Sequence, residues 1–186
     1  EELPDGIRFS LYSPDGEGGF PGNIRVITDY RFNEDNELSV RHYAETDCAT
    51  YINMTNHAYF NLCGKGKKIT EHRLHIPADR ILDTTPAFIP TGKRMNVKNT
   101  PFDFTSLKPI GTDLYADHEQ LLWNKGYNHC YILKDEISVE MLEAASLYEP
   151  VTGRKMTVMT DLPAVLLYTA GYYERPDKAV CLETQF

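Results

Sequence analysis

The stretch Ile24-Arg25-Val26-Ile27-Thr28-Asp29-Tyr30-Arg31-Phe32 alternates apolar and polar side chains with a period of two. In an extended strand one face then carries Ile24, Val26, Tyr30 and Phe32, and the other carries Arg25, Asp29 and Arg31. The stretch from Glu37 to Ala44 alternates in the same way, and the run Asn33-Glu34-Asp35-Asn36 between them is rich in turn-forming residues. This pattern predicts an antiparallel hairpin of two half-buried strands.

Similar short segments recur along the rest of the chain, and turn-forming residues such as those of Pro90-Thr91-Gly92 separate them. We expect further strands at Ala49–Met54, Arg73–Ala78, Cys130–Leu133, Ile137–Leu147, Lys155–Met159, Ala164–Thr169 and Ala179–Leu182. Only Thr112–Trp123 is expected to contain a short helical turn. Many short strands with regular turns predict an all-β sandwich or barrel. Because neither a repeat nor a linker is visible, we expect one domain over residues 1–186.

Composition restricts the class of function. The chain has 186 residues, 41% of them hydrophobic, and a net charge of −8. This acidic balance argues against binding to nucleic acid or to anionic membranes, since both need a basic face. The four cysteines lack CxxC spacing and are expected to be free thiols. With no apolar run long enough to span a bilayer and no visible signal peptide, we expect a cytoplasmic protein.

A second informative stretch is Asn53-Met54-Thr55-Asn56-His57-Ala58-Tyr59-Phe60-Asn61-Leu62. It combines hydrogen-bonding side chains, one imidazole and two aromatic rings. A solvated loop rarely carries so many large rings, and a core strand rarely carries so many amides. The mixture is typical of a cleft that stacks against a small molecule and hydrogen-bonds it at once.

Two residues stand out as candidates for acid–base chemistry. His57 has polar neighbours that can orient its ring, and Glu183 is a carboxylate at the end of the apolar run Val180-Cys181-Leu182. A histidine and a glutamate that face each other across a cleft form a general acid–base pair. His42, His72, His75 and His118 are interpreted as surface or structural histidines. No HExxH, CxxC pair, Asp-rich loop or glycine-rich phosphate loop is present, so we expect no metal and no cofactor.

The chain resembles the aldose 1-epimerase family, also called galactose mutarotase. Its matching motifs occur in the family's order and extend over nearly the whole chain. They are Gly18-Gly19-Phe20-Pro21-Gly22-Asn23, Asp35-Asn36-Glu37-Leu38, Thr55-Asn56-His57-Ala58-Tyr59-Phe60-Asn61-Leu62, Ile89-Pro90-Thr91-Gly92, Thr100-Pro101-Phe102-Asp103-Phe104, Gly126-Tyr127-Asn128-His129, Glu149-Pro150-Val151-Thr152-Gly153-Arg154 and Cys181-Leu182-Glu183-Thr184-Gln185.

The resemblance implies a large antiparallel β-sandwich that interconverts the α and β anomers of free hexoses such as galactose and glucose. It implies no metal or organic cofactor and a free aldohexose as the small-molecule partner. At the matching positions, His57 would be the general acid and Glu183 the general base. The residues that would contact the sugar are Ala58, Tyr59, Asn128 and Leu166.

The chain also departs from the family pattern. Asn128 stands where the family usually has an Asp, and Leu166 stands where it often has a sugar-binding Gln. The family domain is longer, so the resemblance assigns this chain to its C-terminal two-thirds. We expect the N-terminal part, with a second active-site His and an Asn-Arg pair, to lie outside the chain.

Two other functions stay open at this point. The changes at Asn128 and Leu166 are compatible with a non-catalytic sugar-binding or regulatory domain on the same fold. Retention of both His57 and Glu183 argues against it, because a pure binder needs no matched acid and base. An epimerase of phosphorylated hexoses would need a basic phosphate pocket, and no cluster of Arg or Lys is evident near the motifs.

Overall fold

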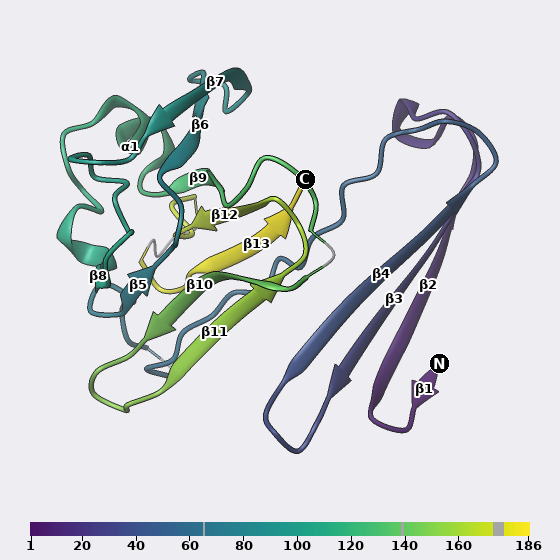
Figure 1. Cartoon of the computed structure of the whole chain (residues 1–186), viewed down its shortest axis with the longest axis horizontal. Coiled ribbons are helices and arrows are strands. Elements are labelled where there is room, and N and C mark those ends of the chain that lie inside the picture. The colour runs from purple at the N-terminus through teal and green to yellow at the C-terminus, as the bar shows by residue number, and fades with distance from the viewer. Residues whose placement is uncertain (65, 139, 173–176) are drawn as a thin grey trace. The chain divides into compact units, whose positions relative to one another are not determined.

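The computed structural model describes residues 1–64, 66–138, 140–172 and 177–186. Within it the chain forms two compact units, residues 1–54 and residues 55–186. The single domain expected from the sequence stays a prediction. Figure 1 shows the strands of both units.

The first unit is one antiparallel sheet with the strand order β1-β2-β3-β4. Its strands are β1 (Glu2–Leu3), β2 (Gly6–Ser13), β3 (Ile24–Phe32) and β4 (Leu38–Thr46), with a short 3-10 turn at Glu17–Gly19. The predicted hairpin is confirmed, because β3 pairs with β4 from Ile24 opposite Thr46 to Phe32 opposite Leu38. The sequence pattern did not reveal β1 and β2.

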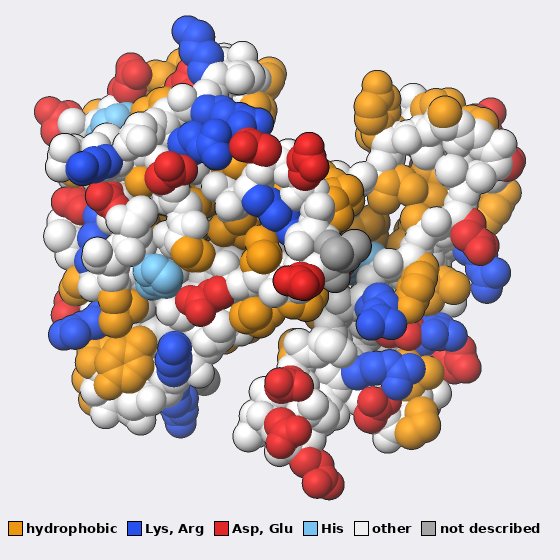
Figure 2. Space-filling model, in the orientation of Figure 1, with side chains coloured by type: hydrophobic (Ala, Val, Ile, Leu, Met, Phe, Trp, Pro, Cys, Tyr) orange, Lys and Arg blue, Asp and Glu red, His pale blue; other side chains and the backbone are white. Residues whose placement is uncertain are grey.

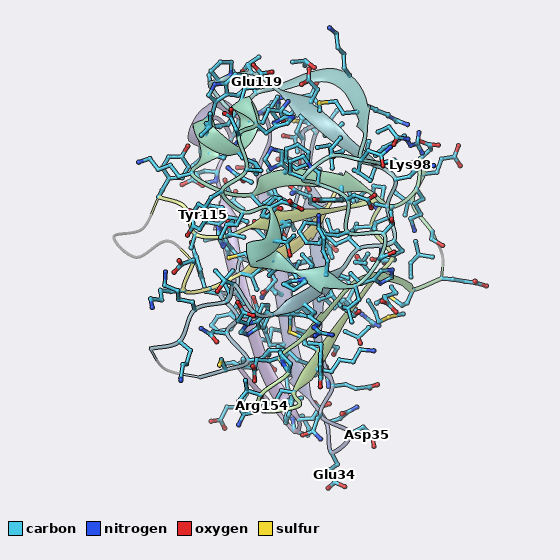
Figure 3. The ribbon with its side chains drawn as sticks, turned by 90° about the vertical axis from the view of Figure 1, so that its left-hand side faces the viewer. Glu34, Asp35, Lys98, Tyr115, Glu119 and Arg154 are labelled. Carbon is cyan, nitrogen blue, oxygen red and sulfur yellow. The ribbon has the colours of Figure 1, made fainter. Side chains whose placement is uncertain are left out.

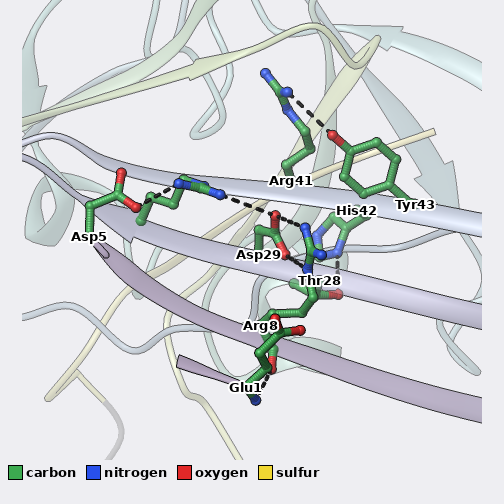
Figure 4. A network of polar contacts seen from close by, with 9 residues as sticks. Glu1, Asp5, Arg8, Thr28, Asp29, Arg41, His42 and Tyr43 are labelled. Atoms are coloured by element: carbon green, nitrogen blue, oxygen red, sulfur yellow. Dashed lines mark hydrogen bonds and ion pairs between the residues drawn. The ribbon is translucent and has the colours of Figure 1, made fainter. Parts of the chain in front are cut away.

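A polar network crosses the middle of this sheet (Figure 4). Arg8 on β2 lies directly opposite Asp29 on β3, and the Arg8 Nε to Asp29 Oδ1 distance is 2.6 Å. A second guanidinium, that of Arg31, lies 3.8 Å from Asp29. Pairing with these cations compensates the burial of the Asp29 carboxylate, which is only 5% exposed. Hydrophobic side chains are visible over β2–β4 in Figure 2.

The second unit contains two antiparallel sheets with the strand orders β11-β10-β5-β8 and β13-β12-β9-β6-β7. The bounds are β5 (Arg73–His75), β6 (Arg80–Thr84), β7 (Pro90–Asn96), β8 (Lys108–Pro109), β9 (Asn128–Ile132), β10 (Leu142–Tyr148), β11 (Lys155–Thr160), β12 (Ala164–Tyr168) and β13 (Cys181–Gln185). The helical segments are a 3-10 turn (Ile110–Thr112) and α1 (Glu119–Asn124). Among the described residues, none of the helices has the length and apolarity that a membrane span requires.

One hydrophobic core joins the two sheets of this unit. Both sheets contribute fully or almost fully buried side chains to it, among them Leu74, Ile81, Tyr131, Leu147, Val165 and Leu182. Each such side chain stabilises the fold by about 1.5–3 kcal/mol relative to an exposed position. Because successive residues of a strand point to opposite faces, the neighbours of Val165 and Leu182 point away from this core. The sandwich expected from the alternating pattern is therefore confirmed.

Two predicted strands need correction. Ala49–Met54 forms no strand, because the pairing of β4 with β3 ends where Thr46 lies opposite Ile24. In Ile137–Leu147, the strand begins only at Leu142, and Val139 lies outside the described residues. Alternation alone cannot show where a partner strand ends. Strands β6, β7 and β8 were not predicted, whereas α1 lies inside the segment expected to contain a helical turn.

Candidate active site

Glu183 occupies the middle of β13, not the strand end expected from the sequence. It lies directly opposite Leu166 on β12, and Leu166 in turn lies opposite Cys130 on β9. Because Leu182 belongs to the core, Glu183 is on the other face of the five-stranded sheet, where it is nevertheless buried. Burial raises the pKa of the Glu183 carboxyl, and the nearby imidazole of His57 counteracts part of that shift.

The segment of residues 55–63, termed here the His57 loop, is irregular but tied to β13. The backbone groups of Phe60 and Val180 exchange two hydrogen bonds of 2.9 Å, which form an isolated antiparallel bridge. Within the loop, the backbone N–H of Ala58 donates to Asn56 Oδ1 at 3.1 Å and closes a tight turn around His57. The loop therefore lies alongside the segment that leads into β13.

The far end of the His57 loop is held by hydrogen bonds to three other segments of the chain. The Asn61 amide donates to the carbonyls of Lys67 and Lys178 at 2.9 and 2.8 Å. The backbone N–H of Leu62 donates to His72 Nε2 at 3.0 Å, and its carbonyl accepts from Arg154 Nη1 at 2.9 Å. Arg154 follows the turn between β10 and β11 and is labelled in Figure 3.

That turn is organised by a buried carboxylate. Glu149 accepts hydrogen bonds from the backbone N–H groups of Thr152 at 2.6 Å and Val151 at 2.9 Å. Hydrogen bonds from Thr152 and Val151, together with the nearby imidazole of His72, lower the pKa of Glu149 to about 2. Burial lowers the pKa of His72. The turn that contains the ionised Glu149 therefore lies near His72, whose neutral imidazole accepts the backbone N–H of Leu62.

These anchors bring His57 and Glu183 together. The distance between His57 Nε2 and Glu183 Oε1 is 3.5 Å. The two side chains differ in solvent access, because that of His57 is 49% exposed and that of Glu183 is 9% exposed. An accessible imidazole next to a buried carboxylate can exchange protons with a small molecule at the surface of the sheet.

Aromatic rings surround this pair. The His57 ring stacks on Tyr59, with ring centroids 4.9 Å apart and planes inclined by 22°. Tyr168 of β12 approaches His57 edge-on at 6.1 Å and Tyr59 at 6.4 Å. The stacked rings restrict the orientation of His57, and half-exposed Tyr59 offers an apolar face beside it.

The predicted sugar contacts fall around the same face of the sheet. Leu166 is next to Glu183 on the neighbouring strand and packs with Tyr168 and Cys181. Asn128 lies opposite Tyr168 at the start of β9, two strands from β13 and therefore about 10 Å away across the sheet. Ala58 shares the turn that carries His57. The fold thus brings all six predicted site residues to one region of the second unit.

Three potential metal ligands also meet here. One ligand atom each from His57, Cys181 and Glu183 lie within 4.8 Å of one another. The sequence motifs did not indicate this group of ligands, because its members come from two segments far apart in the sequence.

Comparison with known proteins identifies the relatives of this chain. A family model described as aldose 1-epimerase matches residues 1–186. The chain belongs to the aldose 1-epimerase family.

Named relatives agree with this family membership. The Escherichia coli aldose 1-epimerase is 35% identical over 89% of this chain and 47% of its own length. The rat galactose mutarotase is 34% identical over 98% of this chain and 55% of its own length. The chain therefore spans about half the length of these curated relatives.

Solved structures of the family share the fold. The galactose 1-epimerase from Lactobacillus acidophilus superposes with a TM-score of 0.87 at 28% identity, over 100% of this chain and 56% of that structure. A GalM/aldose epimerase homologue from C. elegans gives a TM-score of 0.84 at 26% identity, over 100% of this chain and 57% of that structure. The galactose mutarotase-like sandwich expected from the resemblance is thereby confirmed.

In this epimerase-family chain, sequence reasoning overlooked the residues that support the His57 loop. Asn61, His72 and Arg154 carried no sequence signal of their own as anchors, although Asn61 and Arg154 lie inside motifs that match the family. His72 was interpreted as a surface or structural histidine, and its full burial agrees with the structural alternative. Tyr168 was overlooked as well, because only the sheet register places its ring beside His57.

A buried histidine next to Asn128 is expected to make the stability of this chain sensitive to acid. His129 is fully buried, and its Nδ1 accepts the backbone N–H of Asn128 at 2.9 Å. Burial, with a smaller contribution from His118, lowers the pKa of His129 from 6.5 to about 3. Between these two values the unfolded chain binds a proton that the folded chain rejects, so stability falls as pH falls through this window.

We expect His129→Asn to flatten the acid loss of stability. Wild type should lose about 2 kcal/mol of unfolding free energy through His129 between about pH 7 and about pH 5. The Asn side chain keeps an acceptor for the Asn128 N–H but cannot be protonated in this range. Urea unfolding at both pH values measures the difference, and His75→Asn controls for loss of an imidazole as such. Equal pH slopes in wild type and His129→Asn would contradict the assignment.

Proposed function

We propose that this protein interconverts the α and β anomers of a free aldohexose of the galactose or glucose type. The observation that carries the proposal is the 3.5 Å separation between His57 Nε2 and Glu183 Oε1, where a half-exposed imidazole meets a buried carboxylate. Membership in the aldose 1-epimerase family supports the reaction class. The sugar and the roles of individual residues are our inference.

The reaction begins with proton removal from the O1 hydroxyl of the closed sugar. In our proposal the Glu183 carboxylate accepts this proton while His57, as imidazolium, donates one to the ring oxygen O5. The C1–O5 bond breaks and a free aldehyde forms. Positioned proton transfer of this kind contributes about 10²- to 10⁴-fold to a rate.

The aldehyde then turns about the C1–C2 bond, which exposes its other face to O5. Reclosure reverses the proton transfers, because neutral His57 now accepts the proton of the O5 hydroxyl and protonated Glu183 returns a proton to O1. The product is the opposite anomer, and both catalytic groups regain their starting protonation states. The cycle therefore requires neither metal nor organic cofactor, whose absence stays a prediction.

The sugar would lie over the sheet between Tyr59 and the start of β9. Tyr59 offers an apolar ring face to the C–H face of a pyranose, and the Asn128 amide can both donate to and accept from hydroxyls. Ala58 would contribute backbone contacts from the turn next to His57. The Leu166 side chain offers no hydrogen bond, so its contact with the sugar beside Glu183 would be apolar.

Polarimetry tests the proposal directly. Freshly dissolved α-glucose and α-galactose should reach their equilibrium rotation faster with the full-length wild-type protein than in buffer alone. Heat-denatured protein serves as the control for general catalysis by exposed side chains. If neither sugar equilibrates faster than in buffer, the proposed activity on these hexoses is wrong.

The apolar position of Leu166 beside Glu183 gives one reason to keep a second candidate, a non-catalytic sugar-binding or regulatory domain. Calorimetric titration separates the two, because a pure binder takes up sugar with heat release but leaves the rate of mutarotation unchanged.

The cytoplasmic location expected from the sequence stays a prediction. The expected absence of nucleic-acid and membrane partners is a prediction as well.

A further inference from the structure

We propose that His57 Nε2, Cys181 Sγ and one carboxylate oxygen of Glu183 form a binding site for a divalent ion of the Zn²⁺ class, and that an ion bound there inhibits the protein. The first half of this proposal depends only on the ligand geometry. The second half rests on the proposed acid–base function of His57 and Glu183.

The fold explains why these three ligand atoms converge. Cys181 and Glu183 are two residues apart on β13, so their side chains project from the same face of the sheet. His57 reaches that face from outside the sheet because the bridge between Phe60 and Val180 ties its loop to the residue just before Cys181. Two segments that are distant in sequence thus supply three ligands.

The distances suit tetrahedral coordination after small side-chain shifts. Zinc bonds of about 2.0–2.3 Å require neighbouring ligand atoms to lie roughly 3.3–3.8 Å apart. His57 Nε2 and Glu183 Oε1 already lie 3.5 Å apart, and all three ligand atoms lie within 4.8 Å of one another. Side-chain rotations that move Cys181 Sγ and the Glu183 carboxylate by about an ångström would bring all three ligand atoms to the spacing that zinc requires.

The types of ligand select the class of ion. Imidazole and thiolate favour Zn²⁺, Co²⁺ and similar ions over Mg²⁺ and Ca²⁺, which prefer oxygen ligands. Because the side chain of His57 is half exposed, a solvent molecule can reach the fourth position. Three protein ligands with one open position match the ligand number of catalytic zinc sites, whereas structural zinc sites have four protein ligands. On binding, the Cys181 thiol would release its proton to solvent.

Metal at this position would remove both proton-transfer groups at once. The nitrogen that is proposed to protonate O5 would be coordinated, as would a carboxylate oxygen proposed to accept the O1 proton. Inhibition should therefore lower kcat and should be reversed by a chelator. Cys181 has no part in the proposed reaction, so replacing it separates the metal site from the acid–base pair.

The experiment is a titration of the full-length protein with Co²⁺, followed by absorption spectroscopy. Wild type should develop a near-ultraviolet thiolate-to-cobalt charge-transfer band that saturates at one ion per protein, and Zn²⁺ should displace it. Cys181→Ser should lose this band. Competition with a chromophoric chelator should show a Zn²⁺ affinity more than about 100-fold weaker, because even partners outside the coordination shell contribute about 10- to 100-fold.

Matched variants make the outcome specific. Cys130→Ser removes a thiol on the same face of the sheet but outside the triplet, and it should keep the cobalt band. His57→Gln removes a half-exposed ligand and should weaken Zn²⁺ binding without unfolding the protein. A wild type without the charge-transfer band at millimolar Co²⁺, or a band that survives in Cys181→Ser, overturns the site.

Inhibition is scored separately from binding. If the protein accelerates mutarotation, micromolar Zn²⁺ should slow the wild type, and a higher concentration should be needed in Cys181→Ser. Binding without any effect on turnover would overturn the inhibitory half. If no turnover is found at all, the proposed function fails while the spectroscopic test of the metal site still decides the first half.

Discussion

Glu183→Gln is expected to lower kcat/KM for mutarotation by about 10²- to 10⁴-fold. The amide preserves the size of the side chain on β13 but accepts a proton far more weakly than a carboxylate. The opposite neighbour, Leu166, cannot replace the lost base. Polarimetry with α-galactose and α-glucose measures the effect, and calorimetry checks that sugar affinity changes much less than turnover.

A second carboxylate supplies the control for Glu183→Gln. Glu143 lies on β10 in the other sheet and pairs with His75 at 3.3 Å. Glu143→Gln removes one negative charge at a distance from the site and should leave the rate of mutarotation unchanged. A Glu183→Gln protein with nearly wild-type turnover would mean that Glu183 is not the base.

His57→Ala is expected to lower kcat by a similar factor of about 10²- to 10⁴-fold, because the proton donor to O5 is removed. The imidazole is half exposed and stacks on Tyr59, so its loss leaves a gap that solvent can reach. Added imidazole should therefore restore part of the activity in His57→Ala and none in Glu183→Gln. Turnover with and without imidazole, measured by polarimetry, gives the comparison.

The double variant distinguishes a concerted pair from two independent contributions. Groups that act as a unit show strong non-additivity, so His57→Ala combined with Glu183→Gln should cost little more than either change alone. His75→Ala, which removes a histidine on β5, is the control and should keep full activity. A rate for His57→Ala equal to that of wild type would place the acid elsewhere.

Local sequence pattern predicted those parts of the fold that depend on near neighbours. The β3–β4 hairpin followed from alternation on both sides of a turn, and the register from Ile24 to Phe32 agrees with it. The same reasoning failed at Ala49–Met54, where alternating residues have no partner strand. A strand is stabilised by its neighbours across the sheet, and these are not visible within one segment.

The candidate acid and base were recognisable as residue types, but their relationship was not. His57 stood out among amides and aromatic rings, and Glu183 stood out after an apolar run. Neither signal could show that Glu183 lies in mid-strand beside Leu166, or that a bridge between Phe60 and Val180 brings the His57 loop to it. The anchors at His72 and Arg154 were invisible for the same reason, because they act across the chain.

The amino-acid order was sufficient for the all-β class, for the family and for singling out His57 and Glu183 as candidate proton-transfer groups, because these depend on residue type and short-range periodicity. The folded chain alone determined the 3.5 Å approach of His57 to Glu183, the burial of the carboxylate and the convergence of Cys181 on the same point. These properties arise when strands pair in one register and remove water from one side chain but not another. Such long-range contacts are set by packing of the whole unit.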